Sequence, residues 1–359
     1  MVRHKIGSIA VWFVPPLALL GLILSAGDYV ALSQLFLLAL LFSCVLTAIH
    51  HAEVVAHRVG EPFGTLTLAL AITTIEVGLI LSIMLAGTGH EMLARDTIFS
   101  ALMLICTGIV GLCLTVGSVK YGELAFKTAG ATSALTALTV LAGICLVLPN
   151  YTTSAPGPLY VRGQLLFVAI TSAVVWASFV WLQSGKHRDY FLPEEMELDH
   201  STHAQLPSVK MTLFSVFALL TSLISVVGLA KLTSPRIEEV VRSAGLPVAT
   251  LPVLIAFIVL LPETGAALRA AARKRLQTSM NLALGSALAS IGLTIPAVVV
   301  AAILLNQPIA LGIEPKHTAI LAITLFVNAL TFILAKANLL LGVVHLVLCA
   351  TFLVTIILP

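Results

Sequence analysis

A succession of long apolar runs separated by short polar breaks constrains this chain more than any other feature. A helix that crosses a bilayer needs about 20 mainly apolar residues, and eleven runs of that kind occur. They lie near residues 6–26, 30–50, 63–87, 96–117, 126–148, 163–183, 211–230, 248–268, 281–305, 318–335 and 338–358. Hydrophobic residues make up 59% of the 359 residues and charged residues only 10%, against roughly 25% charged in soluble domains. A soluble domain with a polar surface is therefore excluded, and the sequence predicts an all-α integral membrane protein of eleven transmembrane helices.

The remaining composition points away from nucleic acid and from disulfide or zinc frameworks. The 19 Lys and Arg residues are spread over many short loops, without the basic face of a nucleic-acid-binding protein. All cysteines lie inside apolar runs and none forms a C-x-x-C pair, which favours small core residues. They are Cys44, Cys106, Cys113, Cys145 and Cys349. The expected partners are the lipid bilayer and inorganic ions, and the oligomeric state stays open.

Charge and the order of the runs give an orientation and a division of the chain. With the N-terminus in the cytoplasm, about two thirds of the 19 Lys and Arg residues fall on the cytoplasmic side, as the positive-inside rule requires. The C-terminus then lies outside. We expect an orphan first helix over residues 1–28, two five-helix repeats over 29–185 and 211–359, and a cytoplasmic acidic linker over 186–210. The two repeats have opposite orientations, the inverted-repeat arrangement of many secondary transporters.

Two acidic residues lie at a depth where acidic residues are rare. Of the 16 Asp and Glu residues, only Glu76 and Glu263 lie well inside apolar runs. A charge at the centre of a spanning helix costs about 2.5–3.5 kcal/mol on insertion, so such residues mark ion or proton paths. Each glutamate follows the start of its run by a similar length, and the two runs cross in opposite directions, so both reach a similar depth. Pseudo-symmetry of the repeats is expected to bring them together near the midplane.

The chemistry of two buried carboxyl groups favours exchange. In a low-dielectric site each carboxyl is neutralised by a proton or by a bound cation, and not by both. The proton and the cation therefore exclude each other from the site. If a midplane site of this kind opens alternately to each side, the protein exchanges a cation for protons, which is antiport. Hydroxyl oxygens complete the shell that hard cations prefer, and the candidates are Thr73, Thr74, Thr264, Ser286 and Ser290. The sequence predicts ion and proton binding with Glu76 and Glu263 as metal ligands, and neither enzyme activity nor a resident cofactor.

Two further clusters and two rival functions stay open. The cytoplasmic end of the second run carries His50, His51, Glu53 and His57. Histidines titrate near neutral pH, so this cluster is interpreted as a pH sensor or metal regulator, or as histidines bonded to backbone and lipid head groups. The linker carries an acidic patch that is a regulatory cation site or a solvated segment: Glu194, Glu195, Glu197 and Asp199. The rival functions are a cation channel and a membrane metalloenzyme that uses His50, His51 and His57.

Glycine, basic and acidic positions around the two glutamates form a pattern. In the first half its residues are Glu53, Ala56, Arg58, Gly60, Gly64 and Glu76, followed by Gly117, Lys120, Tyr121 and Phe126. In the second half they are Asn281, Gly285, Lys336, Asn338 and Gly342. With this pattern the chain resembles the cation/proton exchangers of the sodium/calcium exchanger superfamily over nearly its whole length. The resemblance implies the superfamily fold, a central site between the repeats, the bacterial inner membrane, and export of sodium, potassium or calcium against protons.

Three positions depart from the family pattern. The Gly-Asn pair before the family's first glutamate is Ile72-Thr73 here, and the glutamine of the ninth span is Leu293. An ungapped comparison from Gly285 puts Ala267, one turn after Glu263, where the family has its second glutamate. With fewer amide ligands the site is expected to hold calcium less well, which favours monovalent cations.

Overall fold

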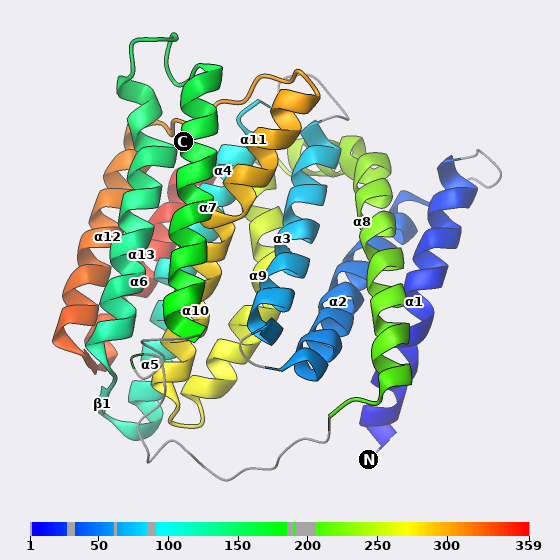
Figure 1. Cartoon of the computed structure of the whole chain (residues 1–359), viewed down its shortest axis with the longest axis horizontal. Helices are drawn as coiled ribbons and strands as arrows, with labels where there is room; N and C mark the ends of the chain where they lie inside the picture. The colour runs from blue at the N-terminus through cyan, green and yellow to red at the C-terminus, as the bar shows by residue number, and fades with distance from the viewer. Residues whose placement is uncertain are drawn as a thin grey trace. The chain divides into compact units, whose positions relative to one another are not determined.

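Helices form almost all of the chain that the computed structural model describes, which is residues 2–26, 33–60, 63–84, 91–184, 190 and 206–358. Figure 1 shows the course of the chain. It divides into two compact units: unit 1 contains Met1–His90 and Thr202–Leu251, and unit 2 contains Glu91–Ser201 and Pro252–Pro359. Each unit therefore takes segments from both halves of the sequence.

Unit 1 is a bundle of four helices centred on α2. Its helices are α1 (Val2–Ala26), α2 (Gln34–Val59), α3 (Phe63–Met84) and α8 (Val209–Ser243), and α2 packs against the other three. Small and polar side chains are buried on α2 and α8, including Cys44 and Ser222, whose carbonyl oxygen accepts a hydrogen bond from the Cys44 thiol at 3.6 Å. Small residues let membrane helices approach closely. Gly228 allows α8 to approach α1 closely, because a Cβ at this position would lie 2.6 Å from a methyl carbon of Leu22.

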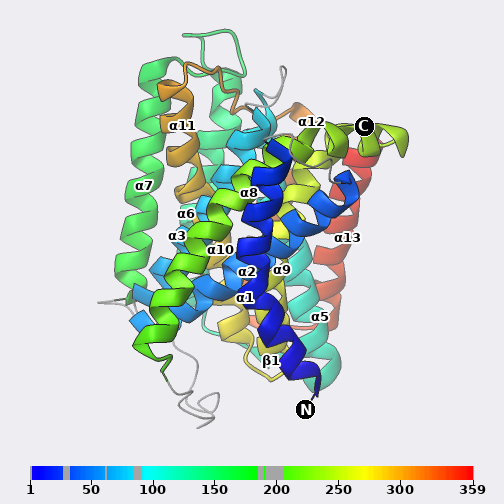
Figure 2. The ribbon, with the colours of Figure 1, turned by 90° about the vertical axis from the view of Figure 1, so that its right-hand side faces the viewer.

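Helix α8 is longer than the apolar run that predicts it. The run ends near residue 230, whereas the helix has 35 residues and ends at Ser243. At about 1.5 Å per residue such a helix exceeds the thickness of a bilayer core. Its last turns bury Thr233, Ser234 and Val241 and expose charged residues, an amphipathic pattern that a count of apolar residues does not detect. Figure 2 shows the helix changing direction toward its C-terminal end, and Pro235 in this region supplies the cause.

Unit 2 contains the remaining helices. The first span is continuous from α4 (Leu93–Met103) through the π-helix η1 (Leu104–Ile109) to α5 (Val110–Tyr121). The others are α6 (Thr128–Ala142) with the short helices η2 (Gly143–Val147) and η3 (Leu148–Tyr151), α7 (Arg162–Ser184), α9 (Thr250–Ala271), α10 (Leu276–Gly292), α11 (Thr294–Leu304), α12 (Pro315–Leu334) and α13 (Leu339–Ile357). Helix α6 packs against α10 and α12, and α13 packs against η1 and α5. Fully buried phenylalanines fill this core, with the rings of Phe99 and Phe352 5.6 Å apart.

A very short antiparallel ladder joins two connections in unit 2. Strand β1 (Leu124–Ala125) follows α5, and β2 (Lys336–Ala337) follows α12. Lys336 donates a 2.7 Å hydrogen bond to Glu123, and this bond raises the pKa of Lys336 above its ordinary value. The ladder pairs backbone groups at helix ends, which helices leave without partners.

The contact between α5 and α13 depends on glycine. A Cβ at Gly342 would lie 2.8 Å from the backbone nitrogen of Thr115 and 3.0 Å from its Cα. On the facing helix, a Cβ at Gly111 would lie 2.9 Å from the Cβ of His345. The two backbones therefore approach more closely than any larger residue allows.

The predicted fold class is confirmed in its main terms. Within the described ranges, ten helices are long and apolar enough to cross a membrane, and the apolar part of α1, Val11–Ala26, is a shorter candidate. The chain is a multi-pass, almost entirely helical membrane protein. The division into an orphan helix and two inverted repeats stays a prediction.

Candidate ion-binding site

Glu76 lies in the middle of an apolar helix and is 3% exposed. It is the fourteenth of the 22 residues of α3. Thr73, one turn earlier, is also buried, so both side chains lie on neighbouring faces of the helix. The Thr74 hydroxyl instead donates to the carbonyl oxygen of Leu70 at 2.7 Å and is exposed. Of the two threonines proposed from the sequence, Thr73 therefore shares the buried environment of Glu76.

Glu263 occupies the same position in its own helix. It is the fourteenth of the 22 residues of α9, and its side chain is half-buried. Pro262 precedes it within the helix and has no N–H to donate to the carbonyl group one turn earlier. Thr264 donates to the Leu260 carbonyl oxygen at 2.7 Å, which leaves the Thr264 oxygen lone pairs available as acceptors. Carboxylate, carbonyl and hydroxyl oxygens thus occur together on α9, and these are ligands that hard cations bind.

Helix α10 carries the two candidate serines of unit 2. Ser290 is 7% exposed, and Ser286 is half-buried one turn earlier. The start of α10 is fixed to α9, because Ser279 donates to the Ala267 carbonyl oxygen at 2.9 Å. Ala267, where the family resemblance places its second glutamate, is therefore a buried packing residue here.

The histidine cluster separates into two environments. His51 is fully buried between helices: its Nε2 lies 3.2 Å from the Val11 carbonyl oxygen and its Nδ1 lies 3.3 Å from Ser215 Oγ. Since a carbonyl only accepts, Nε2 carries the proton and Nδ1 accepts from the serine hydroxyl. His50, Glu53 and His57 are exposed on the other face of α2. No group of three or more His, Cys, Asp or Glu residues within the described ranges could hold a metal ion. The acidic patch of residues 194–199 lies outside the described residues.

Replacing His51 is expected to reduce stability. In His51→Leu the Ser215 hydroxyl and the Val11 carbonyl lose their partners, which costs about 1–3 kcal/mol for each buried group left unpaired. Thermal unfolding of the detergent-solubilised protein measures this loss, and the exposed His50→Gln is the matched control. An unchanged unfolding temperature, together with an altered pH dependence of transport, would instead favour the pH-sensing interpretation of this cluster.

A buried polar cluster on α12 and α13 is not among the site residues predicted from the sequence. Asn328 Nδ2 and His345 Nδ1 both donate to the Cys106 carbonyl oxygen in η1, at 3.1 and 2.9 Å. His345 Nε2 lies 3.1 Å from Thr331 Oγ1, so both of its ring nitrogens are paired. In the sequence, Thr324, Asn328 and Thr331 follow His317 at intervals of seven, eleven and fourteen residues. That spacing places polar side chains on one face of a helix, and it was the signal that could have identified this cluster.

A multi-pass helical membrane protein with an acid inside each of two spans is typical of proteins that move ions or protons. The family described as sodium/calcium exchanger protein matches residues 29–185 and 214–358. Since these two ranges cover most of the chain, the protein belongs to the sodium/calcium exchanger family. It is therefore a member of a transporter family and not of an enzyme family.

Individual relatives agree with this assignment. The chain is 40% identical over 321 residues to y4hA of Sinorhizobium fredii (strain NBRC 101917 / NGR234), covering 89% of this chain and 87% of that protein. It is 33% identical over 361 residues to the sodium-potassium/proton antiporter ChaA of Escherichia coli (strain K12), covering 99% of this chain and 97% of ChaA. The crystal structure of the H+/Ca2+ exchanger CAX shares its fold, with a TM-score of 0.71 and 17% identity over 98% of this chain and 88% of CAX.

Proposed function

We propose that this protein is a secondary active antiporter that exports sodium, potassium or calcium ions in exchange for protons. The observation that carries this proposal is Glu76, a carboxyl group that is 3% exposed at the centre of a 22-residue apolar helix. A membrane protein tolerates such a group at a cost of about 2.5–3.5 kcal/mol, which a transport role explains. The equivalent position of Glu263 in α9 extends the role to a second carboxyl group.

The proposed mechanism uses competition between a proton and a cation. A carboxyl in a low-dielectric environment is neutralised either by binding a proton or by binding a metal ion. Loading one ion on one side therefore requires release of the other, and alternating access carries the exchange across the membrane. Thr73, Thr264, Ser286 and Ser290 are proposed to add oxygen ligands, and Thr74 is the weakest candidate because its side chain is exposed.

Monovalent cations are the proposed main substrates. ChaA, a relative over almost the whole chain, is named for sodium and potassium exchange. Leu293 replaces the family's glutamine with an apolar residue, and Thr73 replaces its asparagine with a hydroxyl. The site therefore has fewer amide oxygens to offer a calcium ion, which takes a shell of 6–8 oxygen ligands. We also propose the bacterial inner membrane as its location, with the N-terminus in the cytoplasm and two inverted repeats.

Everted membrane vesicles from a strain without its own antiporters test the function. A respiratory proton gradient is established and followed with a pH-sensitive dye, and sodium, potassium or calcium chloride is then added. Sodium and potassium are expected to collapse the gradient, and the cation should accumulate against its own concentration gradient, which a channel cannot achieve. Failure of every cation would contradict the proposed antiport, whereas collapse by calcium alone would contradict only the proposed selectivity.

A further inference from the structure

His317 is a buried histidine whose ring has no hydrogen-bond partner among the described residues. It is the third residue of α12 and is 6% exposed, yet neither Nδ1 nor Nε2 bonds to any atom of the described residues. More than nine in ten buried polar groups in folded proteins are paired. An unpaired ring at this depth therefore indicates a bound water molecule or ion, because water commonly satisfies such groups.

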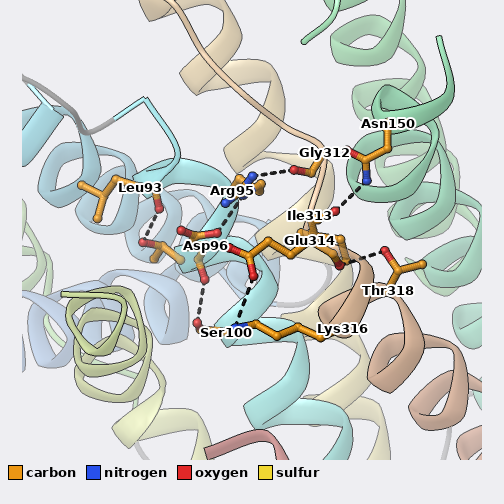
Figure 3. Close-up of polar contacts among 11 residues, drawn as sticks. Leu93, Arg95, Asp96, Ser100, Asn150, Gly312, Ile313, Glu314, Lys316 and Thr318 are labelled. Carbon is orange, nitrogen blue, oxygen red and sulfur yellow. Dashed lines mark hydrogen bonds and ion pairs between the residues drawn. The ribbon is translucent and has the colours of Figure 1, made fainter. Parts of the chain in front are cut away.

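Figure 3 shows a compact group of charges formed by Arg95 and Asp96 of α4 with Glu314 and Lys316 at the start of α12. His317 interacts electrostatically with Glu314, Asp96, Lys316 and Arg95. Arg95 Nε donates to Asp96 Oδ1 at 2.7 Å, and Lys316 Nζ lies 3.3 Å from Glu314 Oε2. These four charges balance in pairs, so the histidine is the group whose charge can change without breaking a pair.

The surrounding elements hold this group in place. Arg95 Nη1 donates to the Gly312 carbonyl oxygen at 2.5 Å, which joins the start of α4 to the segment before α12. The Phe99 ring lies 4.9 Å from the His317 ring and covers one side of it. Helices α6, α13 and η1 and strand β2 pack against α12. The acidic or basic residues of these elements are His345 and, in β2 after the other end of α12, Lys336. Asp96, a quarter of whose side chain is exposed, connects the group to solvent.

A polar face continues along α12 from His317. We define the α12 polar face as His317, Thr324, Asn328 and Thr331, which lie on one side of the helix by their spacing. The last three are 0% exposed, and neither Thr324 Oγ1 nor Asn328 Oδ1 has a partner within the described residues. Asn328 reaches the Cys106 carbonyl oxygen near the middle of its span. Unpaired polar atoms thus recur from the surface end of α12 to mid-depth, and ordered water would pair them.

We propose that His317, with Asp96 beside it, is a proton-loading site, and that the α12 polar face carries protons from it toward the middle of the membrane. This inference rests on the proposed antiport function. The neutral imidazole takes a proton from a hydronium ion at a ring nitrogen and releases a water molecule, and the Asp96 carboxylate stabilises the imidazolium. The proton then passes to water held by Thr324 and Asn328, and the imidazole returns to its neutral form.

The pH dependence of exchange separates this role from simple packing. In reconstituted vesicles the wild-type rate is expected to rise as the pH falls on the side that this end of unit 2 faces. His317→Gln should lose that rise, with an unchanged half-saturating sodium concentration. Asp96→Asn should keep the rise but shift its midpoint lower by about 1 pH unit, because the imidazolium loses an anionic neighbour. Thr318→Val is the matched control, since this neighbouring hydroxyl bonds only the Glu314 carbonyl oxygen.

A second measurement detects the proton directly. Nitrogen-15 NMR of histidine-labelled protein should contain ring resonances that titrate with pH and that disappear in His317→Gln. A wild-type pH profile in His317→Gln, or a His317 ring that does not titrate, would overturn the inference. If Glu76→Gln is inactive while His317→Gln keeps the wild-type profile, only this inference fails. If Glu76→Gln still exchanges ions, the proposed antiport site fails, whatever His317 does.

Discussion

Replacement of either glutamate by glutamine is expected to abolish cation-dependent proton movement for every cation. Glutamine keeps the size of the side chain but has no ionisable carboxyl group. It therefore has no charge for which a proton and a metal ion could compete, and the competition that drives exchange is lost. Removing even a supporting group costs a metal site about 10–100-fold in affinity, and loss of a direct ligand should exceed that. The dye assay in everted vesicles measures the result for Glu76→Gln and Glu263→Gln separately.

Matched variants show whether the charge itself matters. Glu239→Gln removes an exposed carboxylate that bonds only Arg236 and is expected to exchange normally. Glu76→Asp keeps a carboxyl group on a shorter side chain, so it should retain partial exchange at higher cation concentrations. Normal exchange by Glu76→Gln or Glu263→Gln, with equal protein in the membrane, would remove that residue from the ion path.

Replacement of Gly342 by alanine is expected to destabilise the folded protein. The new methyl group would press on the backbone of Thr115 at 2.8–3.0 Å, and backbone atoms of a packed helix cannot rotate away. Overpacking of this kind costs about 1–3 kcal/mol, although alanine by itself favours a helix by about 1 kcal/mol over glycine. Thermal unfolding of purified protein in detergent should show a lower transition temperature and a lower yield of monodisperse protein.

Gly143→Ala provides the control for this prediction. A Cβ at Gly143 meets no atom within 4 Å, so the same substitution should leave stability unchanged or slightly higher. Equal transition temperatures for the two variants would contradict the close approach of α5 and α13.

The sequence predicted the membrane-spanning helices, and it singled out the two acids within them, because both follow from hydrophobicity. A run of 20 apolar residues has few alternatives to a helix in a bilayer, since every backbone group must be paired internally. Glu76 is conspicuous in such a run for the same reason, and its burial agrees with that prediction.

Features that depend on pairing between distant segments could not be predicted in this way. The π-helix η1 and the β1–β2 ladder depend on which helices meet, and local composition contains no record of that. The sequence indicated that His345 lies in a span, but not that it shares the Cys106 carbonyl with Asn328. His317 stands next to charged residues and a proline in the sequence, so it was indistinguishable from an ordinary surface histidine.

The packing of α1 against α2 and α8 has a consequence for variants that lack the first helix. The Val11 carbonyl of α1 satisfies a ring nitrogen of His51, and the Leu22 side chain fills the space above Gly228. A version that begins at α2 would therefore leave His51 Nε2 without its partner and the space above Gly228 unfilled. An apolar residue at position 51 and a bulkier one at position 228 would be the compensating changes in such a version.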